Sequence, residues 1–348
     1  MLTRLSSPTH EELYRVEDHD SGLRGFIALH STRLGPAAGG LRMRMYDGDD
    51  AAVQDVLNLS RGMSYKNAAA GLPLGGGKAV IMGNPETEKT PDLLRAMGRA
   101  IDSLAGRYWT AEDMGMSPGD MAEIARETDF VAGREQGAHA SGDPSPVTAR
   151  GVFDAMQAGA MQLWGKAGLK GRSVAVQGLG HVGWHLCLLL HEAGAQLLVA
   201  DSDPARVAST LKEFGAAQVD TQDIHAAKAD IFAPCAIGAV LNSGSIPNIR
   251  ASMVCGAANN QLATPDDADA LHARGILYLP DYVANGGGII NVAAEILRIA
   301  ERESWVTDRL AAMQVNMAQI LKRAAAENVS PARIADRMVE NQLLAQAV

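Results

Sequence analysis

Residues 173–201, with the sequence SVAVQGLGHVGWHLCLLLHEAGAQLLVAD, decide the fold of this chain. An apolar run typical of a buried strand is followed by the pattern G-x-G-x-x-G, an apolar helical segment and a second apolar run that ends on an acid. This order, with the acid roughly 20 residues after the glycines, is typical of a dinucleotide-binding βαβ unit. We therefore predict a Rossmann-type sheet built around this segment.

The glycine turn predicts how a dinucleotide is held. Glycines let the pyrophosphate approach the backbone at the N-terminus of the helix. Asp201 would accept hydrogen bonds from the adenosine ribose hydroxyls, and its charge would repel a 2′-phosphate. Arg206 is the nearest cation in the sequence, so we expect NAD rather than NADP. The cofactor-binding residues predicted from this unit are Gly178, Gly180, His181, Val182, Gly183 and Asp201.

Two histidines of this unit are spaced as metal ligands on a helix can be. His181 and His185 stand at i and i+4, but no acid or cysteine joins them within the nucleotide turn. We therefore predict no metal site.

The remainder of the second half continues the alternation of strands and helices. Apolar runs near 230–235, 253–260 and 277–281 are typical of buried strands, and the segments near 204–214 and 265–273 are expected to be helical. Residues 305–348 also have a helical pattern. Alternating strands and helices indicate a parallel sheet of the α/β class.

The segment GLPLGGGK (71–78) is the most informative stretch of the first half. We interpret it as a flexible glycine loop that places Lys78 where the loop meets the strand 79–82. A lysine beside apolar residues loses solvation, which favours the neutral amine that proton transfer needs. A phosphate loop is excluded, because Leu72 replaces its first glycine and Ala79 its Ser or Thr. A glycine-rich turn with a surface lysine remains the alternative.

Two further polar residues fall near Lys78 in the predicted pattern. Lys66 lies near the end of an expected helix at 49–69, where it could hold a carboxylate or simply stabilise the helix C-terminus. Asp113 follows a predicted strand at 108–111, and acids at strand ends are common in α/β sites. If the strands are neighbours, Lys78 and Asp113 would form a proton-transfer pair.

Composition sets limits on the class of protein. A length of 348 residues suggests about two domains, and 47% hydrophobic residues suit a packed globular enzyme. A net charge of −9 disfavours nucleic acid as a partner. We also expect no membrane span and no signal peptide. Three cysteines without metal or redox spacing are interpreted as buried thiols of a cytoplasmic protein. They are Cys187, Cys235 and Cys255.

The predicted architecture is α/β with two domains. We place the boundary in the polar, glycine-containing stretch near 136–145. An N-terminal α/β substrate domain would comprise residues 1–140, and a Rossmann NAD-binding domain residues 141–314. The C-terminal helices, about 315–348, are expected to pack back on the first domain.

Eight segments match, in order, the motifs of one enzyme family. They are LGPAAGGLRM (34–43), GLPLGGGKAVI (71–81), TAEDMG (110–115), GDPSPVTARGV (142–152), GLGHVG (178–183), APCAIGAVLN (233–242), GAANNQL (256–262) and PDYVANGGGIINV (280–292). Over nearly its full length the chain resembles the amino acid dehydrogenases of the glutamate/leucine/phenylalanine/valine group, and it looks closest to the leucine and phenylalanine branches.

The resemblance implies an activity and an assembly. It implies NAD-dependent, reversible oxidative deamination of an L-amino acid to the 2-oxo acid and ammonia, in a cleft between the two domains that opens and closes. It also implies a homo-oligomer, from dimer to octamer, with the N-terminal domain making the dimer contact. The implied partners are therefore small molecules and further copies of the chain.

The resemblance also assigns roles to individual residues. It implies that Lys78 and Asp113 are catalytic, and that Lys66 binds the substrate carboxylate with the backbone of Gly39 and Gly40. Further cofactor contacts are implied at Thr148 and Asn259, beside the nicotinamide, and at Cys235 and Ala236.

The implied side-chain pocket is apolar. The glutamate branch recognises its distal carboxylate with a lysine and a serine, where this chain has Ala38 and Val292. A carboxylate buried there without a partner would cost several kcal/mol, so we discard glutamate. Ala38, Met63, Ile289 and Val292 are expected to line the pocket. Leucine, valine, phenylalanine and tryptophan all stay open as substrates, because one methylene changes discrimination by only about 1–3 kcal/mol.

Two alternative functions stay open at this point. An enzyme of the same fold could condense an aromatic 2-oxo acid with a second substrate. A non-catalytic homologue could bind NAD or an amino acid without turnover.

Overall fold

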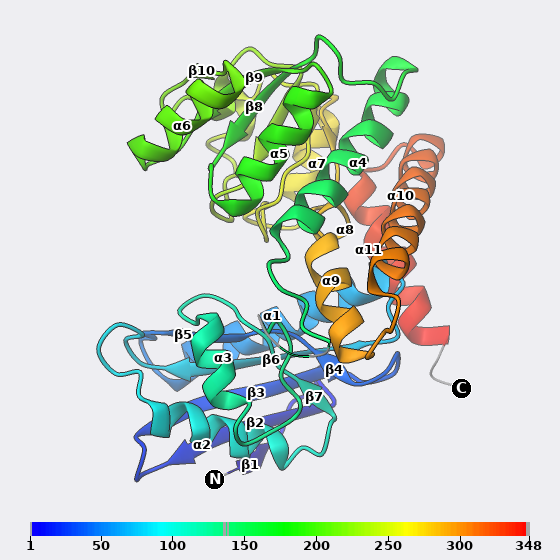
Figure 1. Cartoon of the computed structure of the whole chain (residues 1–348). Coiled ribbons are helices and arrows are strands. Elements are labelled where there is room, and N and C mark those ends of the chain that lie inside the picture. The colour runs from blue at the N-terminus through cyan, green and yellow to red at the C-terminus, as the bar shows by residue number, and fades with distance from the viewer. Residues whose placement is uncertain (1, 135–136, 138, 346–348) are drawn as a thin grey trace. The chain divides into compact units, whose positions relative to one another are not determined.

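The computed structural model describes residues 2–134, 137 and 139–345, which form two compact units. The first unit contains the described residues of Met1–Asp143, Ile289–Val306 and Asn341–Val348, and the second contains Pro144–Gly288 and Thr307–Glu340. Each unit has its own sheet, which confirms the predicted two-domain α/β class (Figure 1).

The first unit is built on a mixed sheet. Among the described residues its strand order is β1-β2-β3-β6-β4-β7, with β5 also paired to β6. The strands from β1 to β6 along this order are antiparallel, whereas β4 and β5 run parallel to β6, and β7 parallel to β4. The elements are β1 (Leu2–Leu5), β2 (Glu12–Asp18), β3 (Leu23–Ser31), β4 (Ala37–Ala38), β5 (Leu41–Arg44), α1 (Asp49–Ala69), β6 (Gly75–Met82), α2 (Pro91–Asp102), β7 (Tyr108–Trp109) and α3 (Pro118–Ile124).

Helices cover both faces of this sheet (Figure 1). Successive side chains of a strand point to opposite faces, so neighbouring residues of β3 enter different cores. Phe26 clusters with Val56 of α1, and Ile27 clusters with Met97 of α2. The central strands β3 and β6 are therefore buried on both sides, which explains their nearly continuous apolar sequence.

The expected glycine loop is not a loop. Gly75, Gly76 and Gly77 are the first residues of β6 and are buried. A Cβ atom at Gly76 would lie 2.1 Å from the backbone nitrogen of Ser64 on α1, and one at Gly77 would lie 2.7 Å from the Tyr108 ring. The interpretation as a flexible loop was wrong because these glycines allow close packing rather than turning. As a result, Lys78 projects from a rigid central strand.

The second unit has the predicted Rossmann topology. Its described strands form a parallel sheet in the order β10-β9-β8-β11-β12-β13, which is the arrangement 3-2-1-4-5-6 of dinucleotide-binding folds. The elements are α4 (Ser145–Trp164), β8 (Ser173–Gln177), α5 (His181–Glu192), β9 (Gln196–Ala200), α6 (Pro204–Phe214), β10 (Ala217–Gln218), η1 (Ile224–Ala226), β11 (Ile231–Pro234), η2 (Ile246–Asn248), β12 (Met253–Val254), α7 (Asp267–Ala273), β13 (Leu277–Tyr278) and α8 (Asp281–Ala284).

The C-terminal helices belong partly to each unit. They are α9 (Gly287–Ile296), α10 (Arg302–Glu327) and α11 (Pro331–Ala345). Residues 307–340 fall in the second unit, although the sequence pattern suggested that 315–348 join the first domain. The functional domain boundaries stay a prediction. Among the residues that the structure describes, no helix combines the length and apolar character needed to cross a membrane.

His10 and His30 both contact α1, and we expect them to make the free energy of unfolding depend on pH. The rings of His10 and His30 meet edge to face at 4.8 Å. Nε2 of His10 lies 3.0 Å from Oγ of Ser60, and Nδ1 of His30 lies 2.8 Å from Oγ of Ser64. Burial, with smaller contributions from His10 and nearby arginines, lowers the pKa of His30 to about 4. The folded state therefore favours the neutral ring.

We predict that the protein loses stability as the pH falls from about 6.5 towards about 4. In that range the unfolded chain binds a proton at His30 and the folded chain does not. The loss should be on the order of 1–2 kcal/mol after solvent screening. Chemical denaturation at a series of pH values measures it. His30→Gln should flatten the slope, and the change at exposed His19→Gln should not; equal slopes in both variants would contradict the assignment.

Candidate active site

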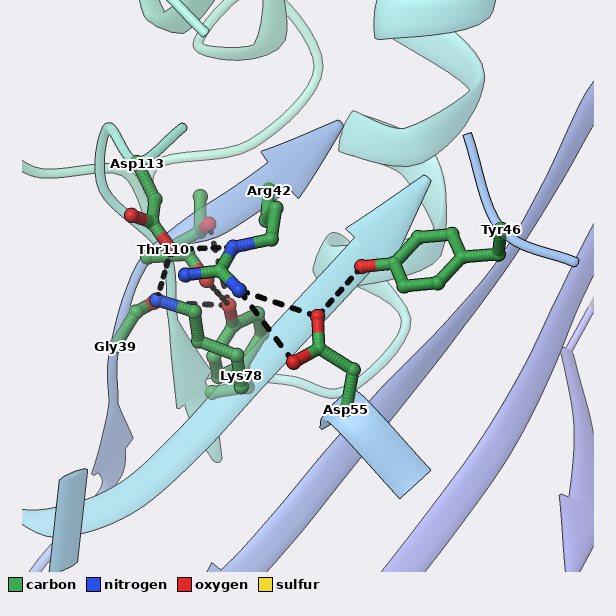
Figure 2. Close-up of polar contacts among 9 residues, drawn as sticks. Gly39, Arg42, Tyr46, Asp55, Lys78, Thr110 and Asp113 are labelled. Atoms are coloured by element: carbon green, nitrogen blue, oxygen red, sulfur yellow. Dashed lines mark hydrogen bonds and ion pairs between the residues drawn. The ribbon is translucent and has the colours of Figure 1, made fainter. Parts of the chain in front are cut away.

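Lys78 and Asp113 form an ion pair in the first unit, between the middle of β6 and the segment that follows β7. Lys78 is buried in β6 and its Nζ lies 2.5 Å from Oδ2 of Asp113 (Figure 2). Asp113 follows β7 in the chain, and its side chain is 24% exposed. The strands β6 and β7 are not neighbours, because β4 lies between them; Asp113 reaches Lys78 because the segment after β7 runs along β5, which pairs with β6, and its side chain can be reached from outside.

The backbone fixes the position of Asp113. Leu41 and Met43 of β5 donate their N–H groups to the carbonyls of Ala111 and Met114, at 2.8 and 2.9 Å. The segment that carries the carboxylate is therefore held along β5 at both of its ends. Such a segment keeps its geometry without depending on the ion pair itself.

A second cation approaches the same oxygen of the Asp113 carboxylate. Nε of Arg42 is 3.4 Å from Oδ2 of Asp113, and its Nη1 is 3.2 Å from Oδ2 of Asp55 (Figure 2). The Tyr46 hydroxyl donates to Asp55 at 2.8 Å. Burial alone would raise the pKa of Asp113, but the two nearby cations, Lys78 more than Arg42, lower it below the ordinary Asp value.

Gly39 and Gly40 pass directly beside this ion pair. A Cβ atom at Gly40 would lie 2.8 Å from Cβ of Asp113 and 3.2 Å from Nζ of Lys78. A Cβ atom at Gly39 would lie 1.9 Å from the carbonyl oxygen of Gly77. Side chains are therefore excluded from this extended link between β4 and β5, in which the Gly39 N–H already donates to the carbonyl of Trp109 at 3.1 Å.

The side chain of Tyr108 holds Gly39 and Gly40 in place. Its hydroxyl donates to the carbonyl of Gly39 at 2.9 Å and lies 3.3 Å from Oγ1 of Thr110. Burial raises the pKa of Tyr108, so it remains a neutral donor. The Gly39–Gly40 link is thus held by a buried hydrogen bond that carries no charge.

Helix α1 brings the predicted substrate residues to this link. Cγ of Met63 would be 2.8 Å from a Cβ atom at Gly39, so the thioether side chain lies against the link. Lys66 follows on the last turn of α1 and is half-buried. Its neighbour Asn67 is buried and donates to the carbonyl of Gly75 at 2.6 Å. The helix is therefore anchored to β6 at the position that carries Lys66.

Helix α9 carries the other two predicted pocket residues. Val292 is buried and Ile289, one turn earlier, is half-buried. The buried Glu295 carboxylate accepts hydrogen bonds from the backbone of Gly133 and Ser141, at 2.8 and 3.1 Å. These bonds fix this part of α9 within the first unit. The role of the two side chains in a pocket stays a prediction.

The second unit holds the glycine turn of the predicted cofactor site. Gly178 has a φ of +97°, and a Cβ atom there would lie 2.7 Å from Cβ of Ala236. A Cβ atom at Gly183 would lie 2.0 Å from the Gly178 carbonyl. At Gly180 the space is open, with Nη1 of Arg206 the nearest atom at 3.8 Å. The turn therefore leaves room for a pyrophosphate beside the N-terminus of α5, as a dinucleotide requires.

Asp201 is more constrained than its predicted role requires. Its carboxylate accepts from the backbone N–H of Leu179 at 2.6 Å and of Asp203 at 2.8 Å. Arg206 stands 3.9 Å away, and the Asp201 side chain is 7% exposed. A carboxylate can accept about four hydrogen bonds, so two backbone donors leave capacity for ribose hydroxyls. Its role in cofactor binding stays a prediction.

The other predicted cofactor residues lie in the same unit. Oδ1 of Asn259 accepts a hydrogen bond from the Asn285 amide at 3.0 Å. The Thr148 hydroxyl donates to the carbonyl of Pro144 at 2.9 Å. His181 and Val182 form the first turn of α5. Burial raises the pKa of Cys235 to about 12, which keeps this thiol protonated and unreactive. Two of these positions are therefore preorganised by hydrogen bonds to the surrounding chain.

Comparisons with known proteins agree with this arrangement. Residues 10–130 match the model of the Glu/Leu/Phe/Val dehydrogenase dimerisation domain, and residues 199–347 match that of Glutamate/Leucine/Phenylalanine/Valine dehydrogenase. The chain belongs to the Glu/Leu/Phe/Val dehydrogenase family. The resemblance inferred from the eight motifs is thereby confirmed.

Individual members of the Glu/Leu/Phe/Val dehydrogenase family match over most of their length. The chain is 46% identical to leucine dehydrogenase of Geobacillus stearothermophilus, over 96% of this chain and 90% of the relative. It is 47% identical to valine dehydrogenase of Streptomyces virginiae, over 96% of this chain and 94% of the relative. The crystal structure of L-tryptophan dehydrogenase from Nostoc punctiforme superposes with a TM-score of 0.85 at 40% identity, covering 98% of this chain and 97% of the other.

Three residues of the site had no assigned role in the sequence analysis. They are Arg42, Asp55 and Tyr108, and each contacts the ion pair, its neighbours or the Gly39–Gly40 link. Arg42 stands inside a family motif, but its pairing with Asp113 depends on the parallel register of β5. The spacing of residues within one segment does not show which residues of another strand lie opposite it. Among the described residues, no cluster of three or more His, Cys, Asp or Glu side chains could hold a metal ion.

Proposed function

We propose that this protein catalyses the reversible, NAD-dependent oxidative deamination of an apolar L-amino acid to the 2-oxo acid, ammonia and NADH. The observation that carries the proposal is the ion pair of the buried Lys78 with the partly exposed Asp113, packed against Gly39 and Gly40, where there is no room for side chains. Membership of a dehydrogenase family supports it. A solvent-poor amine and carboxylate in contact are suited to sequential proton transfers.

The substrate side chain is proposed to be that of leucine, valine, phenylalanine or tryptophan. Family members of high identity are named leucine, valine and tryptophan dehydrogenases. Ala38 and Val292 are apolar and buried, so neither offers a charge to a distal carboxylate. Leaving such a carboxylate without a partner costs several kcal/mol, which disfavours glutamate.

NAD is the proposed cofactor, and it supplies the acceptor for the hydride that leaves Cα of the amino acid. Gly178, Gly180 and Gly183 would hold its pyrophosphate against the N-terminus of α5. The acidic Asp201 favours a free ribose 2′-hydroxyl over a phosphate. Arg206 is the nearest charge of opposite sign, but it is already paired with Asp201 and Asp203.

The residues of the first unit are proposed to handle binding and proton transfer. Lys66 would hold the substrate carboxylate, assisted by the backbone of Gly39 and Gly40, where the Gly39 N–H already donates to Trp109. Lys78 would orient a water molecule for attack on the imine carbon that follows hydride loss. Asp113 would accept the two protons of that water in turn, the first during attack and the second from the resulting hydroxyl, and pass both to the departing nitrogen, so that ammonia leaves and the 2-oxo acid remains.

The protein is further proposed to be a cytoplasmic homo-oligomer. The matched N-terminal model is described as a dimerisation domain. All three cysteines are described by the structure and are unpaired, as in a reducing compartment. Gel filtration with light scattering would measure the number of subunits.

We expect purified protein to reduce NAD with at least one of the four proposed amino acids, measured by NADH absorbance. L-Glutamate should have a kcat/KM lower by roughly 100-fold or more, because its distal carboxylate finds no partner. NADP in place of NAD should also be a poor substrate. D-Leucine serves as the stereochemical control.

The alternatives give different results in the same assay. Tight NAD binding without turnover of any amino acid would favour a non-catalytic homologue. Consumption of an aromatic 2-oxo acid only together with a second organic substrate would favour condensation. Either result would contradict the proposal.

A further inference from the structure

The Asp113 carboxylate lies between two cations, and the proposed mechanism uses only one of them. Lys78 Nζ and Arg42 Nε approach the same oxygen, Oδ2, at 2.5 and 3.4 Å (Figure 2). Leu41 and Met43, the neighbours of Arg42 on β5, donate backbone hydrogen bonds to Ala111 and Met114, which flank Asp113 in the chain. This side-by-side position is therefore part of the sheet, and the Arg42 side chain is only 15% exposed.

A chain of contacts holds Arg42 from its far end. Nη1 of the guanidinium lies 3.2 and 3.4 Å from the two carboxylate oxygens of Asp55 on α1. Tyr46 donates its hydroxyl to the same carboxylate at 2.8 Å. Burial raises the pKa of Tyr46, so this donor stays protonated. Arg42 thus points one nitrogen at Asp113 and another at an acid that is itself fixed.

Proton transfer at Lys78 creates a need for such a cation. When the amine of Lys78 changes its protonation or turns to a water molecule, Asp113 loses its nearest counter-charge. A buried carboxylate without a partner is strongly destabilised. An arginine keeps its charge under all physiological conditions, whereas a lysine can lose its proton. Arg42 can therefore supply a constant positive charge while Lys78 reacts.

We propose that Arg42 is a positioning residue that keeps the Asp113 carboxylate ionised and directed at Lys78, and that Asp55 and Tyr46 hold Arg42 in place. This inference rests on the proposed function of Lys78 and Asp113. Besides the two cations, the titratable groups on the elements around Asp113 include the neutral Tyr108 of β7, the exposed Glu112 beside it in the chain and Lys66 of α1.

Carbon-13 NMR of the aspartate carboxyl groups tests the proposal without any need for turnover. The Asp113 signal is identified by its absence in Asp113→Asn, and its titration is followed in each variant. Arg42→Gln should raise the pKa of Asp113 by roughly 1–2 units. Arg42→Lys, which keeps the charge, should restore most of the difference. The acidic limb of the kcat/KM profile should move in the same direction.

Arg24→Gln is the matched control. Arg24 is also a strand arginine paired with an acid of α1, because its Nη2 lies 3.1 Å from Asp49. Its replacement should leave the Asp113 titration unchanged. If the Asp113 carboxyl group of the folded Arg42→Gln variant has the same titration midpoint as in the wild type, Arg42 is only a structural link between β5 and α1. That result would overturn the proposal.

Lys78→Ala provides an independent test that leaves Arg42 intact. With Arg42 still 3.4 Å from its carboxylate, Asp113 should stay ionised at pH 7 in this variant. A titration midpoint above pH 7 would overturn the proposal even if Arg42→Gln cannot be purified. Because these readouts do not use activity, an inactive wild type would contradict the proposed function, whereas an unshifted titration would contradict only the role of Arg42.

Discussion

Replacing Lys78 with alanine should lower kcat for amino acid oxidation by at least ~1,000-fold while the protein remains folded. General acid–base groups typically contribute about 100- to 10,000-fold, and Lys78 is the buried amine in direct contact with Asp113. The loss should appear in kcat more than in KM, because Lys66 and the backbone of Gly39 and Gly40 are proposed to bind the substrate carboxylate. Steady-state kinetics with NAD and the preferred amino acid measure this split.

Two controls make the Lys78 result interpretable. NADH binding, followed by fluorescence, should be retained, because the predicted cofactor residues lie in the second unit. Lys212→Ala removes an exposed lysine from α6 and should leave kcat unchanged. A Lys78→Ala variant that keeps kcat within about tenfold of wild type would be inconsistent with a proton-transfer role.

Gly76→Ala should produce a large loss of stability in the first unit. The new Cβ atom would lie 2.1 Å from the backbone nitrogen and 2.3 Å from Oγ of Ser64, and 2.5 Å from the Ser60 carbonyl. These are helix atoms that cannot move singly, so α1 must shift away from β6. Overpacking of this kind costs typically 1–3 kcal/mol, and we expect roughly 3 kcal/mol or more here.

Thermal unfolding measures the effect of Gly76→Ala. A cost of about 3 kcal/mol corresponds to a decrease in Tm of roughly 6–12 °C for units of this size. Gly62→Ala is the matched control, since Gly62 lies within α1 and a Cβ atom there meets nothing within 4 Å. That change should be neutral or stabilising by up to about 1 kcal/mol. Equal Tm values for the two variants would refute the close packing of α1 on β6.

Residue patterns predicted the helices and strands whose own sequence has regular apolar spacing and recognisable ends. The predicted helices at 49–69 and 204–214 coincide with α1 and α6, because each combines apolar spacing with end signals such as Asp203 and Pro204. The sequence analysis did not identify β1, β2 or α4. The apolar residues of β1 and β2 are interrupted by charged ones, and tertiary packing rather than pattern selects the structure of these strands.

The candidate site could be predicted in part. Lys78 and Asp113 were found because each stands within or after a predicted strand, and the family motifs mark both. The glycine run 75–77 was misread, because glycine serves equally for turns and for close helix–strand contacts. Arg42 was missed for a different reason. Its contact with Asp113 depends on which strands are neighbours, and that information is not local.

Ammonia dependence is the most direct test of the central claim. NADH oxidation is followed with 4-methyl-2-oxopentanoate or phenylpyruvate, with and without ammonium, and the product is analysed by chiral chromatography. The account predicts that NADH is consumed only when ammonium is present and that the L-amino acid forms in equal amount. NADH oxidation independent of ammonium, or none with any apolar 2-oxo acid, would contradict it.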